Sequence, residues 1–198
     1  MKTIEFRRHS IKDGTGGYML GPQGYAFARR VGEAQLRGRG FSHFFVSSLW
    51  RTHQTLAAFA EGAGDFDLMR VPEFDPMFQI TEGEYDAIEL WHGACRIAEM
   101  AGIDMMAASL QYEKTRVDAL AQLVVGAFRP WIDSIPEGST VLFVGHSPLS
   151  EFVPYGLFGT VLPALRECDG FRIVEDENGL RLDATSADLN AQELRSRI

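Results

Sequence analysis

The stretch TIEFRRHS, residues 3–10, decides how the rest of the chain is interpreted. Ile4 and Phe6 alternate with polar residues, which predicts a short strand that ends at Arg8 or His9. Glycine and small polar residues follow, so we expect the chain to leave the strand in a loop. Open α/β sheets bind ligands beyond the carboxyl ends of their strands, where an arginine beside a histidine can hold an anion. Taken alone, this pair fits a basic surface cluster at a frayed N-terminus better, so the interpretation depends on later stretches.

The totals describe one domain of ordinary size that is able to bury a core, with 198 residues of which 45% are hydrophobic. We expect a single domain over residues 1–185, with an excursion over the site at 72–83, and a polar C-terminal tail at 186–198. The net charge of −8 argues against nucleic-acid and membrane-surface partners. Charged residues near the start leave no signal-peptide segment, and no apolar run reaches the ~20 residues of a membrane span. Cys95 and Cys168 lack C-x-x-C spacing, which favours reduced thiols in a cytoplasmic protein, although the sequence leaves a disulfide between them open.

Two more predicted strands end in residues able to handle an anion. The apolar run HFFVS, residues 43–47, predicts a buried parallel strand, and a helix to about Glu61 follows it, with Ser47 or Ser48 as its N-cap. Arg51 then lies in the first turn of that helix. The run TVLFV, residues 140–144, suits the centre of a sheet and is followed by His146, with a helix starting at Pro148. If the strands are parallel, these side chains share one edge of the sheet with His9.

The remaining elements predict an α/β protein. Besides the helix that starts at Pro148, four helices are expected from turn residues and apolar stripes, and three further strands from short apolar runs. The helices lie at about 24–37, 48–61, 85–101 and 109–132, and the strands at 68–71, 171–174 and 180–183, the last two joined by a hairpin turn at Asn178-Gly179.

Two histidines and two arginines at one edge suggest a site for a phosphoryl group. A guanidinium presents a planar fork of N–H donors that matches two phosphate oxygens, as Arg8 and Arg51 would. Their charge disfavours a protonated imidazole, which leaves His9 a lone pair to attack phosphorus. His146 could donate to a phosphate oxygen, and Lys12 could add a further cation.

In these stretches the chain resembles the histidine phosphatase superfamily, also called the phosphoglycerate mutase-like family. That family has a strand ending in Arg-His-Gly, a Leu-x-x-x-Gly turn, a Ser-x-x-x-Arg-x-x-x-Thr segment and a later strand ending in Gly-His or Ser-His. The matching residues here are Arg8-His9-Ser10, Leu20 to Gly24, Ser47 with Arg51 and Thr55, and Gly145-His146. The resemblance spans Ile4 to about Phe152 and implies a three-layer α/β/α sandwich around a mostly parallel sheet.

The resemblance also implies roles for the residues. His9 would be the phosphorylated nucleophile, with Arg8, Arg51 and His146 forming the phosphate pocket and no cofactor or metal required. Ser10, Lys12 and Ser147 would contact substrate. Ser10 departs from the usual glycine, Lys12 replaces an arginine of the acid-phosphatase branch, and Thr15 stands near an asparagine of the mutase branch. The ending Gly-His-Ser-Pro is similar to the Gly-His-Asn-Pro of the phosphohistidine-phosphatase branch, which favours a phosphatase over a mutase.

The proton donor of the family is a carboxylate after the second segment, and here it stays open. Asp75 lies at about the spacing from Arg51 that the family implies, while Glu82-Gly83 is similar to a later element. Glu73 and Glu84 are further candidates. The phosphohistidine-phosphatase branch has no clear acid, and a phosphoramidate leaving group is basic enough to need less help.

An α/β-hydrolase and a metal enzyme fit the sequence less well. An α/β-hydrolase would use Ser147 as nucleophile, but Leu149 stands where that motif needs glycine and no histidine follows His146. The five histidines show no metal-ligand spacing. Mutase-type transfer, and a protein that binds phosphate without turnover, remain open. The expected partner is a small phosphorylated substrate or a phosphohistidine protein.

Overall fold

The computed structural model describes residues 1–14, 19–66, 73–74 and 81–195, with the side chains of 73–74 and 81–86 left out of the description. The chain divides into two compact units. Unit 1 comprises residues 1–75, 136–146 and 166–198, and unit 2 comprises residues 76–135 and 147–165. The sequence predicted a single domain over residues 1–185.

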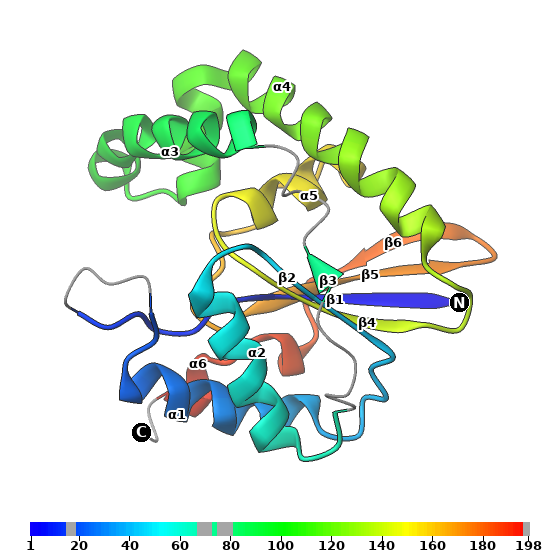
Figure 1. The fold of residues 1–198 in the computed structure, drawn as a ribbon. Helices are drawn as coiled ribbons and strands as arrows, with labels where there is room; N and C mark the ends of the chain where they lie inside the picture. The colour runs from blue at the N-terminus through cyan, green and yellow to red at the C-terminus, as the bar shows by residue number, and fades with distance from the viewer. Residues whose placement is uncertain (15–18, 67–72, 75–80, 196–198) are drawn as a thin grey trace. The chain divides into compact units, whose positions relative to one another are not determined.

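Unit 1 is built on a six-stranded sheet in the order β3-β2-β4-β1-β5-β6 (Figure 1). The strands are β1 (Lys2–Arg8), β2 (His43–Val46), β3 (Glu73–Phe74), β4 (Thr140–Gly145), β5 (Gly170–Asp176) and β6 (Gly179–Asp183). The first four in this order are parallel, whereas β5 pairs antiparallel with β1 and with β6. The α/β fold with a mostly parallel sheet is thus confirmed, and β4 lies inside the sheet because residues 141–144 are all apolar and all buried.

Two helices of unit 1 pack on this sheet. They are α1 (Pro22–Val31), which continues as a π-helix over Gly32–Leu36, and α2 (Trp50–Ala63). The core they share with β2 and β4 includes Phe27, Phe59 and Leu142. The two helices approach so closely that a Cβ on Gly62 would lie 1.7 Å from the carbonyl oxygen of Arg29.

The predicted N-cap of α2 is wrong. Leu49 holds that position, and no side chain caps the helix. The Ser47 hydroxyl instead donates to Thr52 Oγ1 at 3.2 Å, and the Thr52 hydroxyl donates to the Leu49 carbonyl at 2.7 Å. The hydroxyl of Ser47, which the sequence assigned to the N-cap, is therefore hydrogen-bonded to Thr52 in the first turn of the helix.

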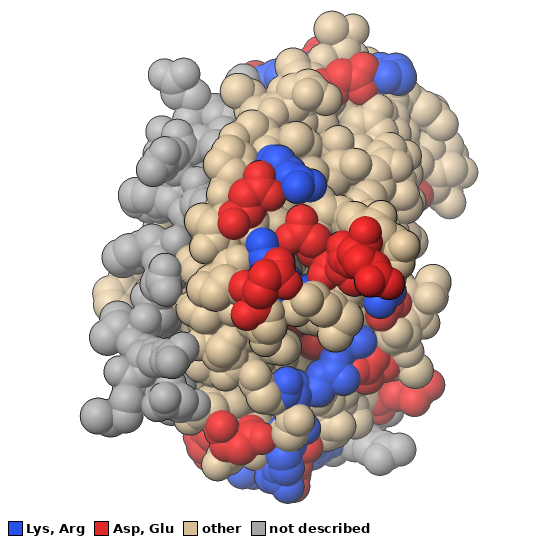
Figure 2. All heavy atoms as spheres, turned by 90° about the vertical axis from the view of Figure 1, so that its right-hand side faces the viewer, with Lys and Arg blue, Asp and Glu red and all other residues tan. Residues whose placement is uncertain are grey.

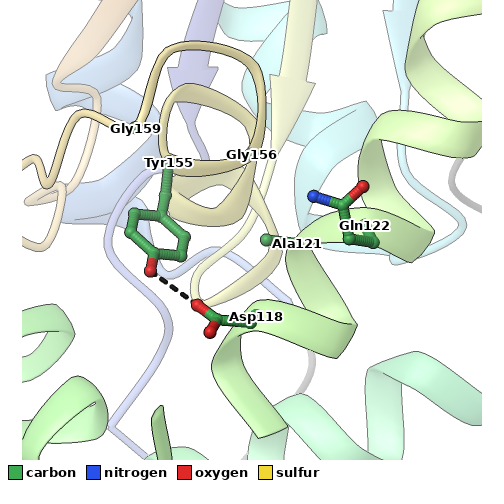
Figure 3. Close-up of a pocket in the computed structure, with 6 residues that line it drawn as sticks. All are labelled: Asp118, Ala121, Gln122, Tyr155, Gly156 and Gly159. Atoms are coloured by element: carbon green, nitrogen blue, oxygen red, sulfur yellow. Dashed lines mark hydrogen bonds between the residues drawn. The ribbon is translucent and has the colours of Figure 1, made fainter. Parts of the chain in front are cut away.

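Unit 2 consists of helices α3 (Thr81–Ala101), α4 (Met105–Ser134) and α5 (Leu149–Phe158). Most residues of the predicted apolar stripes on α3 and α4 are buried, but Trp91, Ala98 and Trp131 are only half-buried and Ala101 is exposed. Asp104 caps α4 by accepting the Met106 N–H at 2.8 Å. Between α4 and α5 is a pocket of about 340 Å³, in which Tyr155 points toward Asp118 and donates to it at 2.7 Å (Figure 3).

Several predicted segments lie wholly or partly outside the residues that the structure describes. The strand expected at 68–71 lies outside the described residues, as does most of the 72–83 excursion, of which 73–74 form β3 and Thr81 begins α3. Cys95 and Cys168 are free thiols. Among the described helices, none is long and apolar enough to cross a membrane.

The predicted polar tail contributes to unit 1. Residues Ala187–Leu189 form a 3-10 helix and Gln192–Arg195 form α6, and Leu189 and Ala191 are buried. Asp188 pairs with Arg39 and with Arg172. On the face drawn in Figure 2, basic and acidic side chains form adjoining patches, without a continuous basic surface.

Candidate active site

The candidate site lies in unit 1, where β1 and β4 end side by side. Arg8 is in register with Gly145, and the His9 N–H donates to the Gly145 carbonyl at 2.9 Å. His9 and His146 therefore follow neighbouring parallel strands. β2 pairs with the other side of β4, and Arg51 lies in the first turn of α2 just beyond β2. Four of the predicted site residues are thus delivered to one edge of the sheet, as parallel pairing requires.

The His9 imidazole is held in one tautomer. Its Nδ1 lies 2.7 Å from the Ser10 carbonyl oxygen, and a carbonyl can only accept, so Nδ1 carries the hydrogen. The pKa of His9 is lowered to about 3, chiefly by burial and further by the charges of Arg51, Arg8 and His146, although the hydrogen bond to Ser10 opposes the shift. At neutral pH the ring is therefore uncharged, with its lone pair on Nε2.

The loop after His9 is tied to both helices of unit 1. The Ser10 N–H donates to Thr55 Oγ1 at 3.0 Å, and the Ser10 hydroxyl donates to the Gly24 carbonyl at 2.7 Å. Thr55 in turn donates to the carbonyl of Arg51 at 2.7 Å. A Cβ on Gly24 would lie 2.0 Å from the Ile11 carbonyl oxygen, so glycine is needed there. Ser10 is fully buried, and both of its donors hold the loop.

His146 is buried, and its Nδ1 lies 3.2 Å from the Ser47 hydroxyl oxygen. Because that hydroxyl donates its hydrogen to Thr52, its oxygen accepts from His146, which places a hydrogen on Nδ1. This contact with Ser47 orients the His146 ring.

Arg8, Lys12 and Ser147 have surroundings that differ from those of the two histidines. Arg8 is about a quarter exposed, and its Nη2 lies 4.0 Å from Glu167 Oε1. Lys12 is exposed and forms a bridge with Leu20. Ser147 belongs to unit 2, where its hydroxyl donates to the buried Glu151 at 2.5 Å.

The predicted proton donor is outside the part of the chain that the structure describes. Asp75 lies there entirely, and the side chains of Glu73, Glu82 and Glu84 do as well. The donor therefore stays a prediction.

Sequence reasoning missed Glu167, which lies in the turn before β5. The start of a strand antiparallel to β1 lies at the edge where β1 ends, which places Glu167 near Arg8 once the pairing of β5 with β1 is known. No residue pattern in the sequence specified that pairing, so the sequence carried no signal for Glu167.

Comparison with known proteins places the chain among its relatives. The family model of the histidine phosphatase superfamily (branch 1) matches residues 4–169. The chain belongs to this superfamily. No curated protein matches the sequence.

Solved structures show the same fold at low sequence identity. Phosphoglycerate mutase from Bacillus anthracis is 17% identical with a TM-score of 0.65, over 98% of this chain and 96% of that one. A phosphoserine phosphatase from Entamoeba histolytica is 16% identical with a TM-score of 0.54, over 96% and 100% of the two chains. The protein histidine phosphatase SixA is 15% identical with a TM-score of 0.53, over 92% and 96%. The fold is therefore phosphoglycerate mutase-like, and the superfamily's chemistry is phosphoryl transfer, by phosphatases and mutases.

Proposed function

We propose that this protein is a metal-independent phosphatase that hydrolyses a phosphomonoester or a phosphoramidate through a phosphohistidine on His9. One observation carries the proposal: a buried, neutral imidazole with its lone pair on Nε2 lies among Arg8, Arg51 and His146. A neutral ring is a nucleophile, and the surrounding cations suit the anion that it would attack.

The reaction has two steps that balance. In the first, His9 Nε2 attacks phosphorus, the bond from phosphorus to the leaving oxygen or nitrogen breaks, and the leaving group takes a proton. In the second, water attacks phosphorus, the bond from phosphorus to His9 Nε2 breaks, and the acid that gave its proton in the first step takes one from the water. Phosphate leaves and His9 is neutral again. Arg8 and Arg51 would each bind phosphate oxygens through a guanidinium fork. His146, oriented by Ser47, would donate to the phosphoryl group as charge develops on it.

The proton for the leaving group would come from Asp75, with Glu73, Glu82 and Glu84 as the other candidates. A small phosphorylated compound and a phosphohistidine protein are the two classes of substrate proposed. Nitrogen leaving groups are basic and readily protonated, so a phosphohistidine substrate would depend less on the acid. The two cysteines without C-x-x-C spacing favour a cytoplasmic setting.

The test is a rapid-quench experiment with labelled phosphate esters and phosphohistidine peptides. We expect label on the protein that is stable in base and lost in acid, as for a phosphoramidate, together with released phosphate. His9→Ala should abolish the label, whereas the control His43→Ala, which removes a half-buried histidine at the opposite end of β2, should retain it.

Other outcomes would redirect the assignment. Label that persists in His9→Ala would identify another nucleophile. Label that passes to a hydroxyl acceptor instead of water would indicate a mutase. Phosphate binding with no label and no turnover would indicate a binding protein.

A further inference from the structure

Glu167 is an acidic residue next to an arginine that the proposed function assigns to phosphate. Its Oε1 lies 4.0 Å from Arg8 Nη2, and the two side chains are 27% and 24% exposed. An anion bound by Arg8 would therefore lie close to a second negative charge. Such a charge is unexpected in a pocket built only to hold phosphate tightly.

The backbone of Arg8 is fixed to the turn that carries Glu167. The Arg8 N–H donates to the Asp169 carbonyl at 2.9 Å, and the Arg8 carbonyl accepts the Cys168 N–H at 3.2 Å. The turn closes through the Asp169 N–H, which donates to the Arg166 carbonyl at 3.0 Å. Cys168 has a φ of 64°, in the left-handed region that is energetically costly for residues other than glycine. The position of Glu167 relative to Arg8 is therefore set by backbone contacts on both sides.

The far side of the Glu167 carboxylate is held by the C-terminal helix α6. Arg195 Nη1 donates to Glu167 Oε2 at 3.1 Å. The helix itself is anchored to the same turn, because Gln192 Nε2 donates to the Glu167 carbonyl and to Asp169 Oδ1, each at 3.0 Å. The carboxylate is thus shared between Arg195 and Arg8, with the shorter distance to Arg195.

We propose that Glu167 is a positioning residue that orients the Arg8 guanidinium and limits how tightly the pocket retains phosphate, and that Arg195 regulates this effect by drawing the carboxylate toward α6. The inference rests on the proposed function in taking phosphate as the anion that Arg8 binds. A phosphatase must release its product at each turnover, and a fixed negative charge beside the phosphate site weakens product binding. The same charge keeps Arg8 in place when the pocket is empty.

The proposal gives opposite signs for two variants. Glu167→Gln removes the negative charge, so inorganic phosphate should bind about two- to fivefold more tightly, the range for partly exposed charge pairs. The kcat for an ester should fall in this variant, because Arg8 loses its orienting partner. Arg195→Met frees one carboxylate oxygen to approach Arg8, so phosphate should bind about two- to fivefold more weakly. A merely destabilised protein would not shift phosphate affinity in both directions.

The experiment measures inorganic phosphate binding to the full chain by calorimetry, and kcat and KM on an ester. The matched controls are Glu177→Gln and Arg181→Met, which remove the same charges from the exposed hairpin of β5 and β6 and should leave phosphate affinity unchanged. If Arg195 acts through Glu167, the double variant Glu167→Gln/Arg195→Met should match Glu167→Gln alone.

Unchanged or weaker phosphate binding in Glu167→Gln would overturn the proposal. Additive effects of the two substitutions in the double variant would overturn the regulatory role proposed for Arg195. Wild-type protein that binds phosphate but hydrolyses nothing would end the proposed function and still permit this comparison. Wild-type protein that binds no phosphate would overturn both.

Discussion

Burial of His9 as a neutral imidazole makes the stability of the fold depend on pH in a defined direction. The pKa of His9 falls from its ordinary value of 6.5 to about 3, chiefly because the ring is buried. Between these values the unfolded chain binds a proton at His9 that the folded chain does not. The free energy of unfolding therefore falls as the pH drops from about 6.5 toward 3, and this contribution is fully recovered above 6.5.

The magnitude follows from the size of the shift. At pH 5 the unfolded chain is one and a half units below the ordinary pKa while His9 in the fold stays neutral, a difference of about 2 kcal/mol. His9→Gln removes the titrating group. The loss of unfolding free energy between pH 7.5 and pH 5 should then be about 2 kcal/mol smaller in this variant than in the wild type.

Urea unfolding at the two pH values, followed by tryptophan fluorescence, measures this double difference. His92→Gln removes an exposed imidazole from α3 and is the control, which should keep the wild-type dependence. Equal pH dependence in wild type and His9→Gln would refute the reasoning. A nitrogen NMR titration provides a direct check, since His9 should remain in its Nδ1–H tautomer at pH 5.

Three further predictions concern the chemistry. Arg51→Ala and Arg51→Lys should both weaken phosphate binding by about 10- to 150-fold, because losing a charge-assisted hydrogen-bonded pair costs about 1.5–3 kcal/mol and lysine cannot bind two oxygens at once. Binding assays with inorganic phosphate measure this effect. Full affinity in Arg51→Lys would show that charge alone suffices. Turnover should survive a strong chelator, since cationic side chains are expected to neutralise the phosphate; activity lost to EDTA and restored by zinc or magnesium would contradict this. If Asp75 is the acid, Asp75→Asn should slow hydrolysis of an alkyl phosphate by about 10²- to 10⁴-fold and leave hydrolysis of p-nitrophenyl phosphate largely unaffected. Glu82→Gln is the control. Equal small effects of both variants on the alkyl substrate would remove both candidates.

The sequence predicted the parts of the site that depend on where strands end. The apolar run of β4 and the alternation in β1 are local signals, and parallel pairing then brings His9 and His146 to one edge without further information. The order of the strands in the sheet had no local signal in the sequence. Glu167 became a neighbour of Arg8 only because β5 returns antiparallel beside β1, a pairing that no residue pattern specified. The hydrogen bonds by which Ser10 holds the loop after His9 could not be predicted either, because their acceptors lie on α1 and α2.

The polar face of β1 shows why alternation alone is an incomplete guide. Glu5 and Arg7 alternate with apolar residues, yet each is only 1% exposed. Arg7 Nη2 lies 2.7 Å from Glu5 Oε1, and Arg172 Nε lies 2.7 Å from Glu5 Oε2. Sharing charges in this way offsets the cost of removing them from water, and loss of one partner would leave a buried charge uncompensated.

The same buried arginine connects the C-terminal segment to the strand that carries the site. Arg7 donates to the carbonyls of Cys168 at 3.0 Å and of Asp188 at 2.5 Å, one in the turn beside Arg8 and the other in the short helix before α6. Arg7 directly precedes Arg8 and His9, so the contacts that bury it also fix the end of β1. Residues 187–195 of the predicted polar tail therefore belong to the framework that holds the candidate active site in place.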